Sequence, residues 1–306
     1  MKKIAVFVIT IALGAGALAI AVHSVRIEGI DLSPCDRKTV HSYSQGSGAE
    51  SFDLPIVMYH NVLKSRQGKY TVSPSQIEKD FQAYQKMGYT PVFMREVIDF
   101  VDGHGHLPQK PMVITFDDGH YNNMHYVLPI AKEFDFKIVI NPVTSFGIFS
   151  QERNEHSNPA YSYLIMSQLA ELEKSGLVEI GNHTHNMHKF KPRYGIKQKS
   201  KETTDEYITA LTADIQKAQD LFTSNGVTRP TTFAYPFGAY NTTARDTLIN
   251  LGFRAFLTCN EGISKVTLGD PSSLYSLKRY NRSGNTTTGA FVKKVFGELE
   301  DADVLK

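Results

Sequence analysis

The sequence predicts an α/β protein whose strands close into a distorted (β/α)7–8 barrel. Short apolar runs of strand type alternate at least seven times with longer stretches of helical periodicity, which is typical of a parallel sheet. Unusual polar residues directly follow several of these strands, and the carboxyl ends of barrel strands gather at one face. The 306 residues are 41% hydrophobic and 21% charged, so the chain has enough apolar material for a core.

The N-terminus predicts export from the cytoplasm. Lys2 and Lys3 precede an uncharged apolar run from residue 4 to 22, which contains small residues such as Ala19 and Ala21. Residues 1–25 are therefore interpreted as a secretory signal peptide or as an uncleaved membrane anchor, and the run is long enough for either. We expect an extracellular or cell-surface protein, in contact with the membrane if the segment is retained.

The rest of the chain divides into a linker and one domain. Residues 26–53 are rich in Ser, Gly and charge, which favours a linker. Residues 54–306 carry the alternating pattern without an internal repeat. The expected strands are residues 54–60, 90–93, 113–117, 137–141, 177–180, 231–235, 254–258 and 277–280. The expected helices are residues 74–88, 95–101, 126–133, 167–175, 203–224, 242–251 and 288–299.

Local signals support these boundaries. Ser73, Pro74 and Gln76 form an N-cap, a proline at the first helical position and a capping-box glutamine. Gly88 ends the same helix. Residues 142–163 show no periodicity and predict an irregular insertion.

Charge and cysteine content exclude some functions. The net charge is +2, and no basic cluster of the kind that binds nucleic acid is present, so no nucleic-acid partner is expected. Cys35 and Cys259 are far apart and neither belongs to a C-x-x-C pair. Cysteine therefore indicates neither a metal site nor a disulfide framework.

Polar residues at four strand ends predict one shared site. The strand at 113–117 ends in two adjacent carboxylates, Asp117 and Asp118, and His60 follows the first strand. Residues 183–188 (HTHNMH) follow the fifth strand, and residues 236–238 (PFG) follow the sixth. Each feature alone is compatible with an ordinary turn or surface loop. Together they predict two histidines and one carboxylate in an open metal site, with room for water and substrate.

These motifs resemble those of the polysaccharide deacetylases, the NodB-homology domains of carbohydrate esterase family 4. Residues 115–119 (TFDDG) are similar to the first motif, which implies a NodB-like barrel with Asp117 as general base and Asp118 as metal ligand. The second motif implies two further ligands, His183 and His188. Their spacing of five, where four is usual, resembles the branch of poly-N-acetylglucosamine deacetylases. His185 between them is an extra histidine, and ligation by it stays an open alternative.

The matches to the family's third motif and to the motif of its catalytic acid are less regular. Residues 233–238 (FAYPFG) resemble the motif whose backbone N–H helps form an oxyanion hole, which implies Phe237 because proline has no N–H. The family's arginine, which orients the base, falls on Ala234, and Arg279 or Arg282 is the expected replacement. The usual late histidine motif is absent, and residues 58–60 (MYH) are its expected substitute, as in circularly permuted members. The resemblance then implies His60 as catalytic acid.

The implied reaction is removal of N-acetyl groups from an N-acetylglucosamine-containing extracellular or cell-wall polysaccharide. It needs one divalent metal, with Zn²⁺ as the expected ion. Two alternatives stay open: a catalytically impaired barrel that binds glycans, suggested by the missing arginine at Ala234, and an O-acetyl esterase that uses the same residues.

Overall fold

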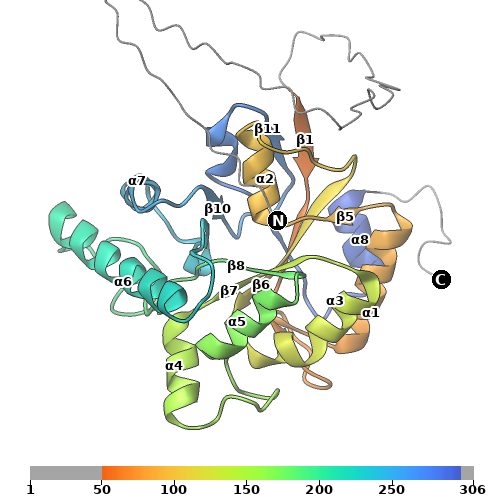
Figure 1. Cartoon of the computed structure of the whole chain (residues 1–306), viewed down its shortest axis with the longest axis horizontal. Coiled ribbons are helices and arrows are strands. Elements are labelled where there is room, and N and C mark those ends of the chain that lie inside the picture. Colours follow the sequence, from red (N-terminus) through yellow and green to blue (C-terminus); the bar gives the residue numbers. More distant parts are fainter. Residues whose placement is uncertain (1–49, 298–306) are drawn as a thin grey trace, which may run out of the picture. The chain divides into compact units, whose positions relative to one another are not determined.

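The computed structural model describes residues 50–297, which form a single α/β unit (Figure 1). Its strands are β1 (Ser51–Leu54), β2 (Ile56–Tyr59), β3 (Asn61–Val62), β4 (Thr71–Val72), β5 (Thr90–Pro91), β6 (Pro111–Asp118), β7 (Ile138–Pro142), β8 (Val178–Ile180), β9 (Thr232–Ala234), β10 (Ala255–Leu257), β11 (Ser264–Thr267) and β12 (Tyr280–Asn281). Its α-helices are α1 (Pro74–Lys86), α2 (Met94–Val101), α3 (Leu128–Phe134), α4 (Thr144–Glu152), α5 (Met166–Lys174), α6 (Thr204–Ser224), α7 (Thr242–Asn250) and α8 (Thr288–Phe296).

Parallel pairings connect the central strands into a circuit. β2, β6, β7 and β8 pair in this order, and β9 pairs with β10. A single bridge between Asn182 and Phe233 joins the first group to the second, and a bridge between Leu257 and Leu277 continues past β10. β12 then pairs with β2. The predicted distorted barrel is confirmed, and the distortion lies at the two junctions that single bridges make.

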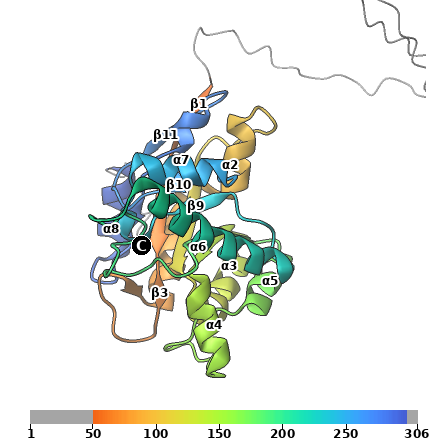
Figure 2. The same cartoon turned by 90° about the vertical axis from the view of Figure 1, so that its left-hand side faces the viewer.

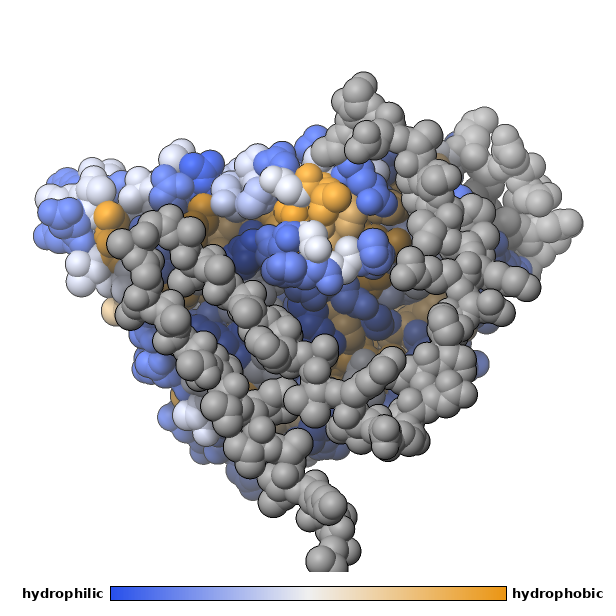
Figure 3. All heavy atoms as spheres, turned by 45° about the horizontal axis from the view of Figure 1, so that its top comes forward, coloured by the Kyte–Doolittle hydropathy of each residue, from blue (hydrophilic) through white to orange (hydrophobic). Residues whose placement is uncertain are grey.

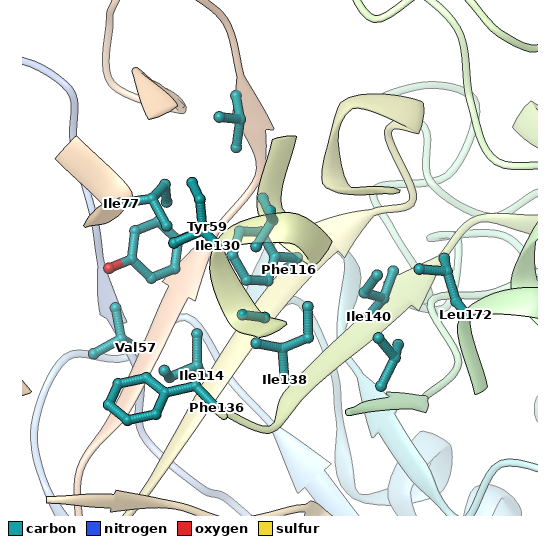
Figure 4. Packing of buried hydrophobic residues seen from close by; sticks show 14 of the residues in the cluster. Val57, Tyr59, Ile77, Ile114, Phe116, Ile130, Phe136, Ile138, Ile140 and Leu172 are labelled. Carbon is teal, nitrogen blue, oxygen red and sulfur yellow. The ribbon is translucent and has the colours of Figure 1, made fainter. Parts of the chain in front are cut away.

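Side chains alternate between the two faces of these strands, as a pleated strand requires. Figure 4 shows outward-facing residues of β2, β6 and β7, such as Tyr59, Phe116 and Ile140, packed together with helix residues such as Ile77 of α1 and Ile130 of α3. In Figure 1 the helices α1, α3 and α5 lie along one side of the strands. This cluster excludes water from one side of the barrel wall and fixes the direction of each strand.

The opposite set of side chains fills the interior. Ile56, Val113, Val139 and Leu257 belong to a second buried cluster, which also contains residues of α2 and β11. Glu179 of β8 lies between two outward-facing residues, and its carboxylate accepts a hydrogen bond from the backbone N–H of Arg95 near the start of α2 (3.2 Å). The Glu179 side chain therefore satisfies a backbone N–H in the first turn of α2, the helix that packs against the barrel interior.

A third cluster covers the remaining wall. Phe233 of β9 and Phe256 of β10 pack under α6 and α7, with Leu211 and Leu248 from the two helices. Figure 2 shows α6 and α7 in front of β9 and β10. The three clusters together position the strand ends at which the site residues lie.

Most expected elements are present within one to three residues of their predicted ends. Ser73 caps α1 as predicted: its hydroxyl accepts from the Gln76 N–H (3.1 Å), and its own N–H donates to the Gln76 side chain (2.9 Å). The insertion at 142–163 was predicted to be irregular, and this was wrong for Thr144–Glu152, which forms α4. The single strand expected at 54–60 is divided between β1 and β2, and β1 pairs with β11, which was not predicted.

The predicted signal peptide or anchor at residues 1–25 lies outside the described residues, as does most of the linker at 26–53. The last three residues of that expected linker belong to β1. Within residues 50–297 no helix has both the length and the hydropathy needed to cross a bilayer.

Candidate active site

The loops that follow β2, β6, β8 and β9 surround one cavity of about 720 Å³, a typical size for a ligand site. All six predicted site residues line it: His60, Asp117, Asp118, His183, His188 and Phe237. Segments far apart in the chain therefore meet at the carboxyl ends of the strands, as the barrel requires.

Asp118, His183 and His188 form the predicted ligand cluster. The Oδ1 atom of Asp118 lies 3.7 Å from Nε2 of His183 and 3.4 Å from Nε2 of His188. One ligand atom from each residue lies within 4.8 Å of the others. One carboxylate oxygen and two imidazole nitrogens, with the cavity beside them, are a donor set suited to a divalent ion with open positions.

The hydrogen bonds around His183 prepare it for ligation. Its Nδ1 lies 2.7 Å from the carbonyl oxygen of Ala234, which only an N–H can satisfy, so the proton is on Nδ1 and Nε2 has a free lone pair. Burial lowers the pKa of His183 to about 4, so the ring is neutral at neutral pH. A neutral imidazole is the form that binds a metal.

The surroundings of Asp118 also fit a cation. Its Oδ1 is buried and has no hydrogen-bond partner among the described residues. Burial alone would raise the pKa of Asp118, but the nearby His120, with Nε2 3.6 Å from Oδ2, and the other histidines hold it well below its usual range. An ionised, buried and unpartnered oxygen that faces two imidazole nitrogens is stabilised by a bound cation.

His185, the extra histidine, does not join this cluster. Its Nδ1 contacts the hydroxyl of Thr144 at 2.8 Å. The backbone N–H groups of His185 and Asn186 donate to the two carboxylate oxygens of Asp214 on α6, both at 2.9 Å. The loop between His183 and His188 is thus held by α4 and α6, and this geometry favours the spacing of five.

Asp117 is held in a buried network. Its two oxygens accept from Nη1 and Nη2 of Arg279 at 2.9 and 2.8 Å, and Oδ1 also accepts from the side-chain amide of Asn141 at 2.9 Å. Burial raises the pKa of Asp117, but Arg279 opposes this and the net effect lowers it to about 2. The carboxylate is therefore ionised and fixed in one orientation.

This network resolves the question of the missing arginine. Arg279 comes to Asp117 from the segment between β10 and β12, while Arg282 pairs with the buried Asp80 at 2.7 Å. Ala234, where the family's arginine falls, is buried in the interior cluster. Asn141 was not predicted, although a polar residue at an inward position near the end of β7 is the same signal that indicated Asp117. Gly181 leaves room for it, because a Cβ at residue 181 would lie 2.0 Å from Oδ1 of Asn141.

His60 lies at the end of β2, where its ring contacts the Tyr70 ring with centroids 4.9 Å apart. Its Nδ1 is buried and unpartnered among residues 50–297. Burial lowers the pKa of His60 below 6.5, although the negative charges of Asp118 and Asp117 act in the opposite direction. His60 lines the cavity together with Asp117 and Asp118.

Phe237 has a left-handed backbone conformation with φ +59°, which is strained for a residue with a side chain. The N–H groups of Gly238 and Ala239 donate to the carbonyls of Tyr235 and Pro236. In this turn the Phe237 N–H is the donor left for a ligand, since proline has none.

The comparisons identify the family. The model of the polysaccharide deacetylase family matches residues 104–256, which is half of the chain. The chain belongs to the polysaccharide deacetylase family. The match includes the first, second and third motifs and ends inside β10, so the His60 and Arg279 segments lie outside it.

Curated relatives include two poly-β-1,6-N-acetyl-D-glucosamine N-deacetylases. The one from Escherichia coli (strain K12) is 26% identical over 265 residues, which cover 78% of this chain and 38% of that protein. The one from Staphylococcus aureus (strain MRSA252) is 28% identical over 175 residues, which cover 56% of this chain and 55% of that protein. The chain thus spans about two fifths of the length of the first relative and about half of the length of the second.

A solved structure supports the fold. The de-N-acetylase from Aggregatibacter actinomycetemcomitans matches with a TM-score of 0.68 and 22% identity, over 80% of this chain and 100% of that one. At this identity the likeness establishes a shared architecture, in agreement with the NodB-like barrel predicted from the motifs.

Proposed function

We propose that this chain is a metal-dependent deacetylase that removes N-acetyl groups from an N-acetylglucosamine-containing polysaccharide. The observation that carries the proposal is the adjacency of two differently prepared carboxylates. Asp118 faces two imidazole nitrogens, whereas Asp117 is held by Arg279. Carboxylates in such different surroundings can divide ligand and base roles between them.

Asp118, His183 and His188 would hold one divalent ion, with Zn²⁺ as our proposed ion because two imidazoles and one carboxylate suit it. When bound, such an ion polarises the acetamide carbonyl and lowers the pKa of a water molecule toward about 7.

The side chains supply the proton transfers. Asp117 is ionised and accepts a proton from the attacking water, while Arg279 and Asn141 hold its oxygens in place. The Phe237 N–H donates to the oxyanion of the tetrahedral intermediate. His60 protonates the nitrogen that leaves, because expulsion of an unprotonated amide anion is too costly.

The substrate and location are part of the same proposal. The named relatives act on poly-β-1,6-N-acetylglucosamine. An N-terminal signal or anchor, as the sequence predicts, would place the domain outside the cytoplasm, where such polymers accumulate. We propose an N-acetylated polysaccharide as substrate and an extracellular or cell-surface location.

Release of acetate from N-acetylglucosamine oligomers tests this function. We expect release that a chelator abolishes and that added Zn²⁺ restores. No release by the metal-loaded protein from β-1,6- or β-1,4-linked oligomers would contradict the proposal. Release from an O-acetylated oligosaccharide alone would instead indicate the esterase alternative. The feature that suggested an impaired barrel, the missing arginine at Ala234, no longer favours it, because Arg279 contacts Asp117.

A further inference from the structure

Two buried asparagines lie shortly after the carboxylates of the active site. The described surface in Figure 3 is mainly hydrophilic, as expected for polar side chains that stay in water. Asn122 and Asn123 are exceptions, because they are 1% and 0% exposed. Burying a carboxamide is costly unless it makes hydrogen bonds, so the contacts of these two side chains indicate what they are buried for.

Both asparagines contact the segment that carries the proposed acid. Asn123 donates through Nδ2 to the carbonyl oxygen of His60 at 3.0 Å. Asn122 accepts from the backbone N–H of Val62 at 3.0 Å and donates through Nδ2 to Oδ1 of Asn61 at 2.6 Å. Two successive side chains of one segment therefore hold three successive residues of the other.

These contacts link the two segments beyond the end of the strand pairing. β2 and β6 are paired in register up to Tyr59 and Phe116, one residue before His60. Past this pair, the side chains of Asn122 and Asn123 supply hydrogen bonds to the backbone that follows β2. The place of the acid relative to the segment after β6 therefore depends on these two side chains.

The asparagines are themselves fixed by their own segment. The backbone N–H of Asn123 donates to the carbonyl oxygen of His120 at 3.0 Å, and Asn123–Val127 forms a π-helical turn. Nδ2 of Asn122 also donates to the carbonyl oxygen of Pro159 at 3.0 Å. Single π-helical turns are frequent at functional sites. The segment that carries the active-site carboxylates thus also carries rigid groups that hold the acid.

The His60 ring depends on this support of its backbone. Its Nδ1 is buried without a hydrogen-bond partner among residues 50–297, and the ring packs edge-on against the Tyr70 ring. A ring without a hydrogen bond at Nδ1 follows its backbone when the backbone moves. A general acid must lie within about 3 Å of the atom that it protonates, so a small displacement takes it out of reach.

We propose that Asn123, together with Asn122, is a positioning residue that holds the acid His60 at a fixed place relative to the two active-site carboxylates. The inference rests on the proposed function, and it names the groups that keep acid and base at a constant separation. The competing explanation is a purely structural role, in which the amides only satisfy buried backbone groups. Loss of an amide would then lower stability without acting through His60.

A double-mutant cycle on an N-acetylglucosamine oligomer separates these two roles. Asn123→Leu keeps a similar volume and removes the donor to the His60 carbonyl. We expect kcat to fall about tenfold, with KM changed less than about twofold and the metal content unchanged. In the His60→Ala background the same change should lower kcat less than about twofold, because the displaced acid is already absent. If Asn123→Leu does not fold, Asn123→Ala removes the same donor without added bulk and takes its place.

Gln219→Met is the matched control. Gln219 is 1% exposed, and its Nε2 donates to the carbonyl oxygen of Pro230 at 2.9 Å. As in Asn123, its amide oxygen is buried without a partner among the described residues, and Gln219 does not line the cavity. The control should lower Tm and leave kcat unchanged. Wild-type kcat in Asn123→Leu, or an equal loss with and without His60, would overturn the inference while the deacetylase function stands.

NMR spectroscopy decides the inference separately if the wild-type protein deacetylates no oligomer, a result that would refute the proposed function. In proton–carbon spectra of protein with labelled histidine, the His60 ring signal is the one that His60→Ala lacks. It should shift or broaden in Asn123→Leu and stay in place in Gln219→Met. A His60 signal that is unchanged in Asn123→Leu would overturn the inference.

Discussion

Arg279 and Asp117 are 162 residues apart in sequence, and the Arg279 guanidinium makes two hydrogen bonds to the Asp117 carboxylate, at 2.9 and 2.8 Å. Both side chains are buried. A bidentate guanidinium–carboxylate pair fixes orientation as well as charge. This pair therefore keeps the proposed base ionised and correctly oriented in a site where burial alone would raise its pKa.

Arg279→Lys should reduce turnover about 100-fold without loss of metal, because lysine keeps the charge but not the planar fork that orients Asp117. The acidic limb of the pH–rate profile should move to higher pH than in wild type, since lysine keeps the charge of Arg279 but loses part of the hydrogen bonding that lowers the pKa of Asp117 against the effect of burial. Arg282→Lys is the control, because Arg282 pairs with Asp80. It should lower Tm and leave the profile unchanged. If Arg282→Lys instead lowers turnover and shifts the profile while Arg279→Lys does not, Arg282 would be the residue that orients the base.

His60→Ala should keep the metal and lower turnover sharply, because the proposed acid is lost. In wild type the alkaline limb should lie below pH 6.5, since burial lowers the pKa of His60 and activity falls as pH rises through that pKa. The variant should lose this limb. His125→Ala, an exposed histidine, is the control. Turnover within about threefold of wild type with the limb intact would mean that His60 is structural.

Asp214→Ala should weaken metal binding by about 10–100-fold, a usual effect of removing groups that orient ligands. The change deletes the acceptor for the N–H groups of His185 and Asn186, which lie between the two proposed ligand histidines. Competition with a chromophoric chelator measures the effect. Asp220→Ala, an exposed carboxylate on the same helix, should bind metal like wild type. Equal affinity in both variants would mean that the loop needs no support from α6.

Glu179 should make stability depend on pH. Burial raises the pKa of Glu179 from 4.5 to about 7. Ionising this carboxyl in the folded protein therefore costs about 3 kcal/mol more than in water. Because the unfolded state releases this proton first, the free energy of unfolding should fall as the pH rises from about 4.5 to about 7. The glutamine side chain in Glu179→Gln is neutral at every pH. Chemical denaturation should therefore show a smaller decrease in the free energy of unfolding over this pH range. Glu171→Gln is the control, because Glu171 is exposed on α5, and this variant should show the same decrease as wild type. An unchanged slope in Glu179→Gln would contradict the assignment.

The sequence predicts the barrel and most of the site because both depend on local patterns. Apolar runs mark the strands, and polar residues at their ends mark the cavity, so His60, Asp117 and His183 could be placed at one face without a structure. Asn141 follows the same rule but was overlooked, because one asparagine in a strand is a weak signal.

Other features depend on tertiary contacts that the sequence does not display. Nothing in the local pattern distinguishes Arg279 from Arg282, and their partners lie far away in the chain. The start of α4 has no side-chain cap; instead, the N–H groups of Thr144 and Ser145 donate to the carbonyls of Thr184 and His185. A helix whose first turn is satisfied by a distant loop shows no start signal in its own sequence.

Asp117→Asn tests the central claim, the division of labour between the two carboxylates, most directly. The amide keeps the shape and two hydrogen-bonding atoms but cannot take up a proton. We therefore expect wild-type metal content and a turnover reduced by about two to four orders of magnitude on an N-acetylglucosamine oligomer. His183→Ala, measured alongside, should lose the metal as well as the activity. Loss of the metal in Asp117→Asn, or turnover close to wild type with the metal bound, would contradict the account.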